Sequence, residues 1–402
     1  MKLKLSAPRV RRDPYPTFAY LREHDPVHRA YLPMVGVVWY VSRYDDVTSV
    51  FRDPRLANCR ANVGDGKGTP KWLPRSFKPF VDSMITADGA EHRRLRALVQ
   101  VAFTPRRIEA LRSSVEAVIE ERLDVLAANA SRGRAELIED FALPVPLRII
   151  SEMMGVRVEE QRGFHTLTNR FMELADKGMP GLFLGARNTL KLLSFLRRQV
   201  AEKRERPGSD LVSALLQAEA DGERLTDDEV AAMIFLLLLA GHETTVNLLG
   251  NGVLALLDHP SELAKLRDDP SLIDGAVEEL LRYANPVSQV SPRHARETFE
   301  FRGRRIRRGD MVMPLIAAAN RDPRAFERAD QLDITRTPNR HLAFGLGVHY
   351  CLGSPLARIE GKLAINGLLR RFPEIELRVP RGRLRWRRSS LIRGLSELPL
   401  RL

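Results

Sequence analysis

The stretch that decides the fold is Phe344–Gly353, which reads FGLGVHYCLG. It sets one cysteine, Cys351, among glycines, and glycine takes φ > 0 or passes close to a bulky group at least cost. The next residues, Ser354-Pro355-Leu356, predict the start of a helix, because proline is tolerated in a first turn. Cys351 therefore precedes a helix N-terminus, where unpartnered N–H groups and the helix dipole favour a thiolate.

The cysteine has three interpretations from the residues themselves. A single cysteine in a glycine-rich loop is often a small buried hydrophobic residue. A zinc site of His341, His349 and Cys351 would still need a fourth ligand, and the C-x-x-C pairs usual for zinc do not occur. A thiolate that projects from a glycine loop, with an aromatic ring at Phe344, instead suits axial ligation of a haem iron.

The full pattern of the stretch, Phe-Gly-x-Gly-x-His-x-Cys-x-Gly followed by Leu356-Ala357, resembles the haem-binding loop of the cytochromes P450. Nearly the whole chain is similar to soluble, bacterial-type members of that family. The resemblance implies a mainly α fold with a minor β-sheet region, in which an α-helical domain and a small β-rich domain surround a buried haem b (iron protoporphyrin IX). It also implies that Cys351 is the axial ligand of the iron and that Phe344 and Gly345 contact the cofactor.

Length and composition fit one globular enzyme. The chain has 402 residues, of which 44% are hydrophobic and 29% charged, so global disorder is excluded. The resemblance implies one cytochrome P450 domain over residues 1–402, with no fused reductase or ferredoxin. Two cysteines fit a reducing cytosol. The longest uncharged run, Val230–Gly241, is shorter than the roughly 20 residues of a membrane span, and no secretory leader is apparent. We therefore expect a cytoplasmic, soluble monomer that does not enter a membrane.

The net charge of +13 leaves several kinds of acidic partner open. The densest basic run is Arg381–Arg388, and its Arg-x-Arg-x-Arg alternation predicts a strand with one solvated face. Aromatic residues make up only 6% of the chain, which offers few stacking platforms for bases. A basic helical nucleic-acid-binding protein, with Cys351 merely structural, is therefore the distant alternative, and we expect no nucleic acid partner.

The pattern along the chain predicts mostly helix. Helix is expected from residue 14 to 22 and over Tyr44–Phe51, and almost continuously over Glu91–Leu256. Strands are expected at Val35–Val41, Val287–Val290, Phe299–Phe301 and Met311–Met313. Thr226 and Glu229 have the spacing of a capping box.

The hexapeptide Ala240–Thr245, AGHETT, lies in the most apolar helical stretch, where a carboxylate is costly unless it is paired or hydrated. Gly241 could end one helix and Glu243 start the next. Apolar residues recur from Val246 onward, however, which predicts one helix that continues through a local bulge. The hexapeptide resembles the oxygen-binding motif of the family. The resemblance implies that Glu243 and Thr244 are the catalytic acid–alcohol pair, which delivers protons during oxygen activation.

Two further sets of charged residues match family motifs. Glu279 and Arg282 are three apart on a helix, which by itself indicates a surface ion pair. The family's Glu-x-x-Arg pair is buried and interlocks with a third residue, so Glu279, Arg282 and Arg336 are expected to hold the haem loop. A haem also has two propionates that need cations. The residues that match the family's propionate contacts are His92, Arg96, Arg293 and His349.

The resemblance also places a substrate pocket. Its expected lining is largely apolar and comes from five segments: Leu73, Met84 and Ile85; Phe171, Met172, Leu182 and Phe183; Phe235, Leu236, Leu239 and Ala240; Val287 and Val290; Leu391 and Ile392. Such a lining indicates an apolar substrate of the polyketide or macrolide, terpenoid, steroid or fatty-acid type. The expected reaction is insertion of one oxygen atom from O2, by C–H hydroxylation or epoxidation.

Electrons must come from outside, because the chain has no flavin or iron–sulfur motif. The resemblance implies a separate ferredoxin and an NAD(P)H-dependent ferredoxin reductase. An acidic ferredoxin is expected to dock on a basic face, whose candidate residues are Arg93, Arg94, Arg106, Arg107, Arg358 and Lys362. The nearer alternative is a haem-thiolate peroxygenase that uses H2O2 directly and has no need of Glu243 and Thr244.

Overall fold

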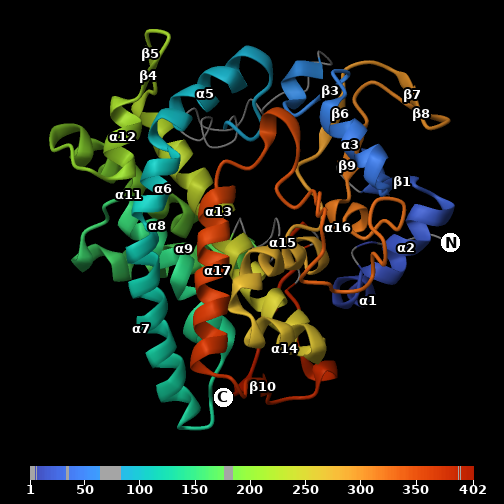
Figure 1. Ribbon diagram of the computed structural model, residues 1–402. Helices are drawn as coiled ribbons and strands as arrows, with labels where there is room; N and C mark the ends of the chain where they lie inside the picture. The colour runs from blue at the N-terminus through green and yellow to red at the C-terminus, as the bar shows by residue number, and fades with distance from the viewer. Residues whose placement is uncertain are drawn as a thin grey trace. The chain divides into compact units, whose positions relative to one another are not determined.

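The computed structural model describes residues 5, 7–32, 36–63, 83–175, 184–387, 389 and 391–402. These residues form two compact units. The described parts of Met1–Gly68, Ile119–Ala142 and Thr244–Leu402 make up the first unit, and those of Thr69–Val118 and Leu143–Glu243 the second. Helices dominate and strands are short (Figure 1), which confirms the predicted mainly α fold with a minor β region.

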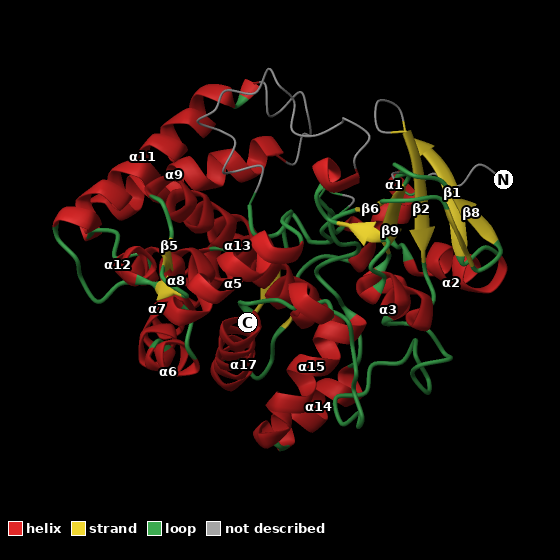
Figure 2. Cartoon of the chain, turned by 90° about the horizontal axis from the view of Figure 1, so that it is seen from above, coloured by secondary structure: helices red, strands yellow, loops and turns green. Residues whose placement is uncertain are grey.

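The first unit contains a five-stranded sheet of strand order β1-β2-β9-β6-β3. Its strands are β1 (Val27–Leu32), β2 (Gly36–Val41), β9 (Met311–Pro314), β6 (Arg293–Ala295) and β3 (Leu56–Ala57). The pair β2–β9 is parallel, and the other three pairs are antiparallel. The predicted strands at Val35–Val41 and Met311–Met313 are confirmed as β2 and β9. Figure 2 shows β1, β2 and β9 close to α2 and α3.

Strand β2 is buried on both faces because its side chains alternate between two hydrophobic clusters. Trp39 and Val41 pack with Val47 and Val50 of α3 (Tyr44–Arg52). Their neighbours Val38 and Tyr40 pack in the other cluster, which contains Phe18 and Leu21 of α2 (Tyr15–His24). A strand covered on both faces reads as a continuous apolar run, which is why the sequence predicted it clearly.

The helices of the first unit surround this sheet and the cysteine loop. They are α1 (Pro8–Arg12), α2, α3, α14 (Pro260–Asp268), α15 (Ile273–Tyr283), α16 (Ile316–Ala319) and α17 (Ser354–Arg371). Two short strand pairs are β7 (Phe299–Phe301) with β8 (Arg304–Ile306), and β10 (Glu376–Leu377) with β11 (Leu400–Arg401). Single turns are η1 (Arg60–Val63), the π-helical η3 (Ile138–Ala142), η4 (Pro270–Leu272), η5 (Gly347–His349) and η6 (Arg381–Arg383).

Helix α17, which follows the cysteine loop, packs closely against its neighbours through glycine. A Cβ atom at Gly361 would lie 3.1 Å from Leu248 Cδ2 and 3.3 Å from Val277 Cγ1. Leu248 belongs to α13 (Asp227–Leu257) and Val277 to α15. The missing side chain lets the two neighbouring helices approach the backbone of α17 in a densely packed core.

The described residues of the second unit are helical apart from one hairpin and connecting loops. Its elements are α5 (Gly89–Ala102), α6 (Pro105–Ala110), α8 (Pro144–Met153), α9 (Val158–Ala175), α11 (Ala186–Glu205), α12 (Leu211–Gln217), β4 (Glu219–Ala220) and β5 (Glu223–Arg224). Helices α7 (Arg112–Ala130) and α13 contribute residues to both units. At the start of α13, Thr226 N donates to Glu229 Oε2 and Glu229 N donates to Thr226 Oγ1, which confirms the predicted capping box.

Two strand predictions are wrong. The segment Arg381–Arg388 begins as the 3-10 turn η6 after Pro380. The carbonyl of Gly382 accepts from Arg12 Nη2, and Arg381 pairs with Asp258. Farther along, Trp386 forms only an isolated antiparallel bridge to Leu395, and Arg388 lies outside the described residues. The segment Val287–Val290 forms only an isolated bridge, from Val287 to Ile392.

The predicted bulge in α13 is also wrong. Residues 227–257 are α-helical without interruption, including Gly241. Ile150 packs over that position, because a Cβ atom at Gly241 would lie 3.6 Å from Ile150 Cδ1. The helix therefore needs no distortion to accommodate the glycine.

Within the part of the chain that the structure describes, α13 is the one helix long and apolar enough to cross a membrane. A core helix of a globular protein meets the same criteria of length and composition. Of its most apolar stretch, 61% is buried inside the protein.

Candidate active site

The cysteine loop is fixed by its glycines and by backbone hydrogen bonds. Gly345 and Gly347 have φ of 71° and 76°, a region that other residues enter only with strain. Cys351 N donates to Phe344 O at 2.9 Å. The Cys351 side chain is exposed, and α17 starts three residues later at Ser354. The structure thus presents an accessible thiol just before a helix N-terminus, as the sequence predicted.

A half-buried ion-pair cluster supports the loop from the side of α15 and α17. Arg358 Nε donates to Glu278 Oε1 at 2.6 Å, and His341 Nε2 lies 3.0 Å from Glu278 Oε2. Burial would raise the pKa of Glu278, but the hydrogen bonds from Arg358 and His341 outweigh it and lower the pKa to about 2. The Arg358 guanidinium also lies over the ring of Phe344, 4.5 Å from its centroid. Both ring nitrogens of His341 are engaged, Nε2 with Glu278 and Nδ1 with the N–H of Ala343, so His341 is not placed as a zinc ligand.

Of the four predicted propionate contacts, Arg293 and His349 lie in the same unit as Cys351. Arg293 is buried at the start of β6, and its guanidinium lies 5.6 Å from the ring centroid of Phe51. His349 Nε2 lies 2.5 Å from Asn58 Nδ2. His92 and Arg96 belong to α5 of the second unit, where their spacing of four puts them on one helix face.

The predicted acid–alcohol pair lies on α13. Glu243 is buried with 7% of its surface exposed, and Thr244 is half-buried. One turn earlier, Leu239 and Ala240 are exposed although the neighbouring Leu238 is only 1% exposed. The middle of this apolar helix therefore presents Leu239 and Ala240 on an uncovered surface, beside a buried carboxylate.

Sequence reasoning missed a second buried acid close to this pair. Thr245 Oγ1 donates to Glu360 Oε2 at 3.0 Å, and the two residues are 2% and 3% exposed. Burial raises the pKa of Glu360 to about 8, and the hydrogen bond from Thr245 offsets this only in part. No spacing in the sequence relates the two residues, because they are 115 positions apart on α13 and α17.

The raised pKa makes stability depend on pH. Below about pH 4.3 the carboxyl is protonated in both the folded and unfolded chain. As the pH rises toward 8, the unfolded chain ionises first, so the free energy of unfolding falls by about 1.4 kcal/mol per pH unit. Glu360→Gln, which keeps an acceptor for Thr245, should therefore be more stable than the natural protein by about 4 kcal/mol at pH 8. Urea unfolding between pH 5 and 9 measures this difference.

The matched control is Glu374→Gln, at an exposed position after α17, which should leave the pH dependence unchanged. Parallel pH curves for the natural protein and Glu360→Gln would show that Glu360 has an ordinary pKa. A variant that is less stable at every pH would show that the buried carboxyl serves packing that glutamine cannot replace.

Glu279, Arg282 and Arg336 lie together in the core. Arg282 and Glu279 are both 0% exposed and form a bidentate ion pair, with N–O distances of 2.8 and 2.7 Å. Arg336 Nε donates to Glu279 Oε2 at 3.1 Å. Arg282 also donates to the carbonyls of Asn320, Ala329 and Gln331. The cluster ties α15 to the irregular chain that leads to the cysteine loop.

The predicted pocket residues fall into separate groups. Val287 and Ile392 pair in an antiparallel bridge, and Ser288 N donates to Leu391 O at 2.8 Å, so two distant segments meet. In the second unit, the rings of Phe171 and Phe235 lie 5.3 Å apart. Met84 is buried and Ile85 is 41% exposed. Leu73, Leu182 and Phe183, and the side chain of Met172, lie outside the described residues.

The chain is similar to known proteins over most of its length. The profile of the family described as Cytochrome P450 matches residues 187–381. The polyketide biosynthesis cytochrome P450 PksS of Bacillus subtilis is 41% identical over 97% of this chain and 96% of its own. Its solved structure has a TM-score of 0.92 and covers 99% of both chains. The cytochrome P450 monooxygenase PikC of Streptomyces venezuelae and a vitamin D(3) 25-hydroxylase of Pseudonocardia autotrophica are each 40% identical, over 97% and 96% of this chain and 91% and 93% of their own.

The chain belongs to the cytochrome P450 family. It is a monooxygenase with haem as its cofactor, acting on O2 and an organic substrate. The residues present fit that cofactor: a thiol on a glycine loop suits the iron, and the N–H donors of Arg293 and His349 suit carboxylates. The nucleic-acid-binding alternative is wrong.

Proposed function

We propose that this enzyme inserts one atom of O2 into an apolar small molecule of the polyketide or macrolide type, chiefly by C–H hydroxylation. The observation that carries the proposal is the exposed thiol of Cys351 on its loop with two positive-φ glycines before α17. The names of two relatives support the substrate class and reaction, since one refers to polyketide biosynthesis and the other to a 25-hydroxylase of vitamin D(3).

Cys351 would be the axial ligand of the iron, with Phe344 and Gly345 against the cofactor. Arg293 and His349, together with His92 and Arg96, would hold the propionates through charge-assisted hydrogen bonds. Haem supplies the activation of O2 when it is bound. The thiolate would be stabilised by the dipole of α17, whose N-terminus follows Cys351.

Glu243 and Thr244 would deliver the protons that the reaction consumes. The Thr244 hydroxyl can donate and accept a hydrogen bond at the reacting oxygen, and the Glu243 carboxyl can pass protons to it. Burial of Glu243 keeps bulk water away from the pair. The substrate would lie against the apolar surface formed by Leu239 and Ala240.

Electrons would come from a separate acidic ferredoxin and its reductase, with the whole chain acting as one cytoplasmic domain. Three of the predicted docking residues are engaged within the protein: Arg94 with Glu91 and Glu229, Arg358 with Glu278, and Lys362 with Asp274. The others are the exposed arginines Arg93, Arg106 and Arg107 on α5 and α6. The docking surface therefore reduces to these three.

The proposed function is tested by supplying haem-loaded enzyme with NADPH, ferredoxin, ferredoxin reductase and 18O2, together with a panel of macrolactones and sterols. The expected product carries one 18O atom per turnover, seen by mass spectrometry. Reduction should slow several-fold between low salt and about 0.3 M salt, because the docking charges are screened. Equal turnover with H2O2 alone would identify a peroxygenase instead.

A further inference from the structure

The first unit contains a cavity of about 710 Å³ that has no part in the proposed reaction. That volume lies in the range of small-molecule sites. Its lining comes from four parts of the chain: residues 12–19, the end of α13, the end of α15 with Arg321 and Asp330, and residues 381–393. Its described lining includes none of the cysteine loop and none of the residues predicted for the substrate pocket.

Stacked arginines form two walls of this cavity. The Arg321 guanidinium lies 3.8 Å from the ring centroid of Tyr15 and 3.5 Å from that of Tyr283. The Arg393 guanidinium lies 3.5 Å from the ring centroid of Trp386. The faces of these rings are thus already covered by cations, so they are not available to a cationic ligand.

Hydrogen bonds hold both guanidinium groups in place. Arg321 donates twice to Tyr283 O, at 3.1 and 2.8 Å, and Tyr15 Oη donates to the same carbonyl. Arg393 Nη2 donates to Arg12 O at 3.2 Å. Fixed guanidinium groups lose little freedom when they bind an anion, which favours binding.

The charges that line the cavity favour a negative ligand. Four arginines face three aspartates there: Arg12, Arg321, Arg381 and Arg393 against Asp13, Asp258 and Asp330. Asp258 is paired with Arg381 at 3.0 Å, and the exposed Asp330 lies 3.3 Å from Arg321. Arg393 has no carboxylate partner among the described residues, and its buried Nε–H lacks an acceptor. Burial lowers the pKa of this guanidinium, which nevertheless stays charged at neutral pH.

We propose that this cavity is a second ligand site, which binds a small organic oxyanion with an apolar body. The oxyanion, a carboxylate or a phosphate ester, would accept from Arg393 and Arg381, since a guanidinium matches both groups with two parallel bonds. The apolar body would lie against Leu254, Ala255 and Leu384.

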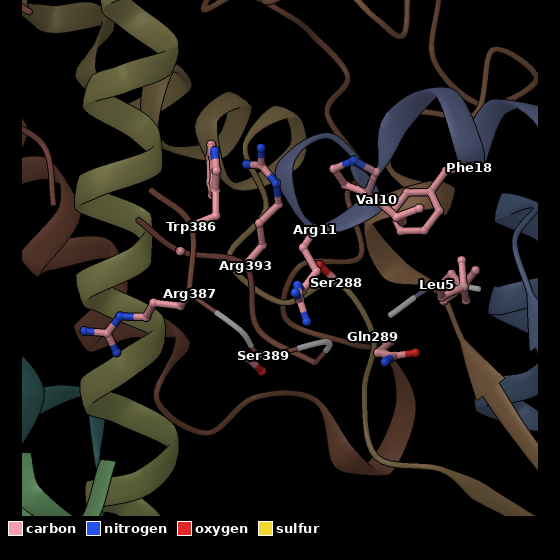
Figure 3. A pocket seen from close by; sticks show the side chains of 13 residues that line it. Leu5, Val10, Arg11, Phe18, Ser288, Gln289, Trp386, Arg387, Ser389 and Arg393 are labelled. Carbon is pink, nitrogen blue, oxygen red and sulfur yellow. The ribbon is translucent and has the colours of Figure 1, made fainter. Parts of the chain in front are cut away.

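The proposed ligand site shares residues with a neighbouring cavity that borders the predicted substrate pocket. Arg393 and Trp386 also line a small separate cavity together with Ser288 and Gln289, and Figure 3 shows the two side chains side by side. Ser288 and Gln289 lie between Val287 and Val290 in the sequence. An anion bound to Arg393 therefore contacts a side chain that borders the segment expected to face the substrate.

The experiment is calorimetric titration of the haem-loaded enzyme with 2-naphthoate, its neutral analogue 2-naphthamide, and inorganic phosphate. Imidazole is present to occupy the iron. The expected result is one molecule of naphthoate bound per chain and no binding of the amide. Tighter binding of phosphate than of naphthoate assigns the phosphate ester rather than the carboxylate. Binding of neither anion, equal binding of the amide, or loss of naphthoate binding when imidazole is added would overturn the proposal.

Three variants assign the binding to the cavity. Arg393→Gln should weaken binding about tenfold or more, the loss expected for one charge-assisted bond. Arg385→Gln removes an 80% exposed arginine of the same segment that does not line the cavity, so binding should be unchanged. If Arg393→Gln fails to fold, Arg381→Gln, at a 67% exposed position, replaces it. Unchanged naphthoate binding in folded Arg393→Gln, or in Arg381→Gln where that replaces it, would overturn the assignment to this cavity.

Discussion

Cys351→Ser should abolish the absorbance band that sulfur-ligated ferrous haem gives with carbon monoxide. The thiol is exposed on a loop fixed by two positive-φ glycines, and serine has nearly the same size but a far weaker donor for iron. Monooxygenase turnover should fall by more than about a hundredfold, the upper loss typical when only a supporting partner of a metal ligand is removed. Difference spectra of the reduced protein with carbon monoxide, followed by turnover assays, provide the measurement.

The chain offers a matched control for this substitution. Cys59 is the other of the two cysteines, it is half-buried, and Cys59→Ser should keep both the band and the turnover. If Cys59→Ser loses the band while Cys351→Ser keeps it, the ligand has been assigned to the wrong cysteine. If both variants keep it, iron is bound by a group other than sulfur of cysteine.

Glu279→Ala should lower the free energy of unfolding by about 3–5 kcal/mol, the usual cost of breaking a buried ion pair on one side. Arg282 would remain fully buried with its charge uncompensated, because its other partners are the neutral carbonyls of Asn320, Ala329 and Gln331. Arg336 and the amide of Asn339 would lose the same acceptor. Urea unfolding, and the fraction of protein purified with haem, measure the effect.

The exposed pair Arg370–Glu120 provides the comparison. Its side chains are 68% and 52% exposed, so Glu120→Ala should cost no more than about 1 kcal/mol. Glu279→Gln keeps the shape and two lone pairs of the side chain but not its charge. Its loss in free energy of unfolding should lie between those of Glu120→Ala and Glu279→Ala. Similar losses for Glu279→Ala and Glu120→Ala would mean that solvent reaches the Glu279 cluster in solution.

Two elements were readable in the sequence for different reasons. The capping box at Thr226 and Glu229 is made by neighbours in sequence. The apolar run of β2 reflects burial of both its faces. The alternation of Arg381–Arg388 led to a wrong strand prediction, because contacts with residues distant in sequence decide this segment. Arg381 and Gly382 bond to Asp258 and Arg12, more than a hundred residues away, and these contacts override a pattern of period two.

The candidate active site also has a part that the sequence predicts and a part that it does not. Cys351 and its glycines are contiguous, so one motif predicts the loop. The Thr245–Glu360 bond and the meeting of Val287 with Ile392 depend on packing between segments separated by 115 and 105 positions, which no spacing in one sequence records. Arg336 as third member of its cluster came from family resemblance alone, because nothing near Glu279 in the sequence points to it.

The glycine at position 361 limits how this enzyme can be redesigned. Its backbone touches two other helices, and even a methyl group would press on Leu248 and Val277. A displacement there would move α17, which begins three residues after Cys351. Laboratory evolution toward new substrates should therefore leave position 361 as glycine and vary the chain segments around the substrate.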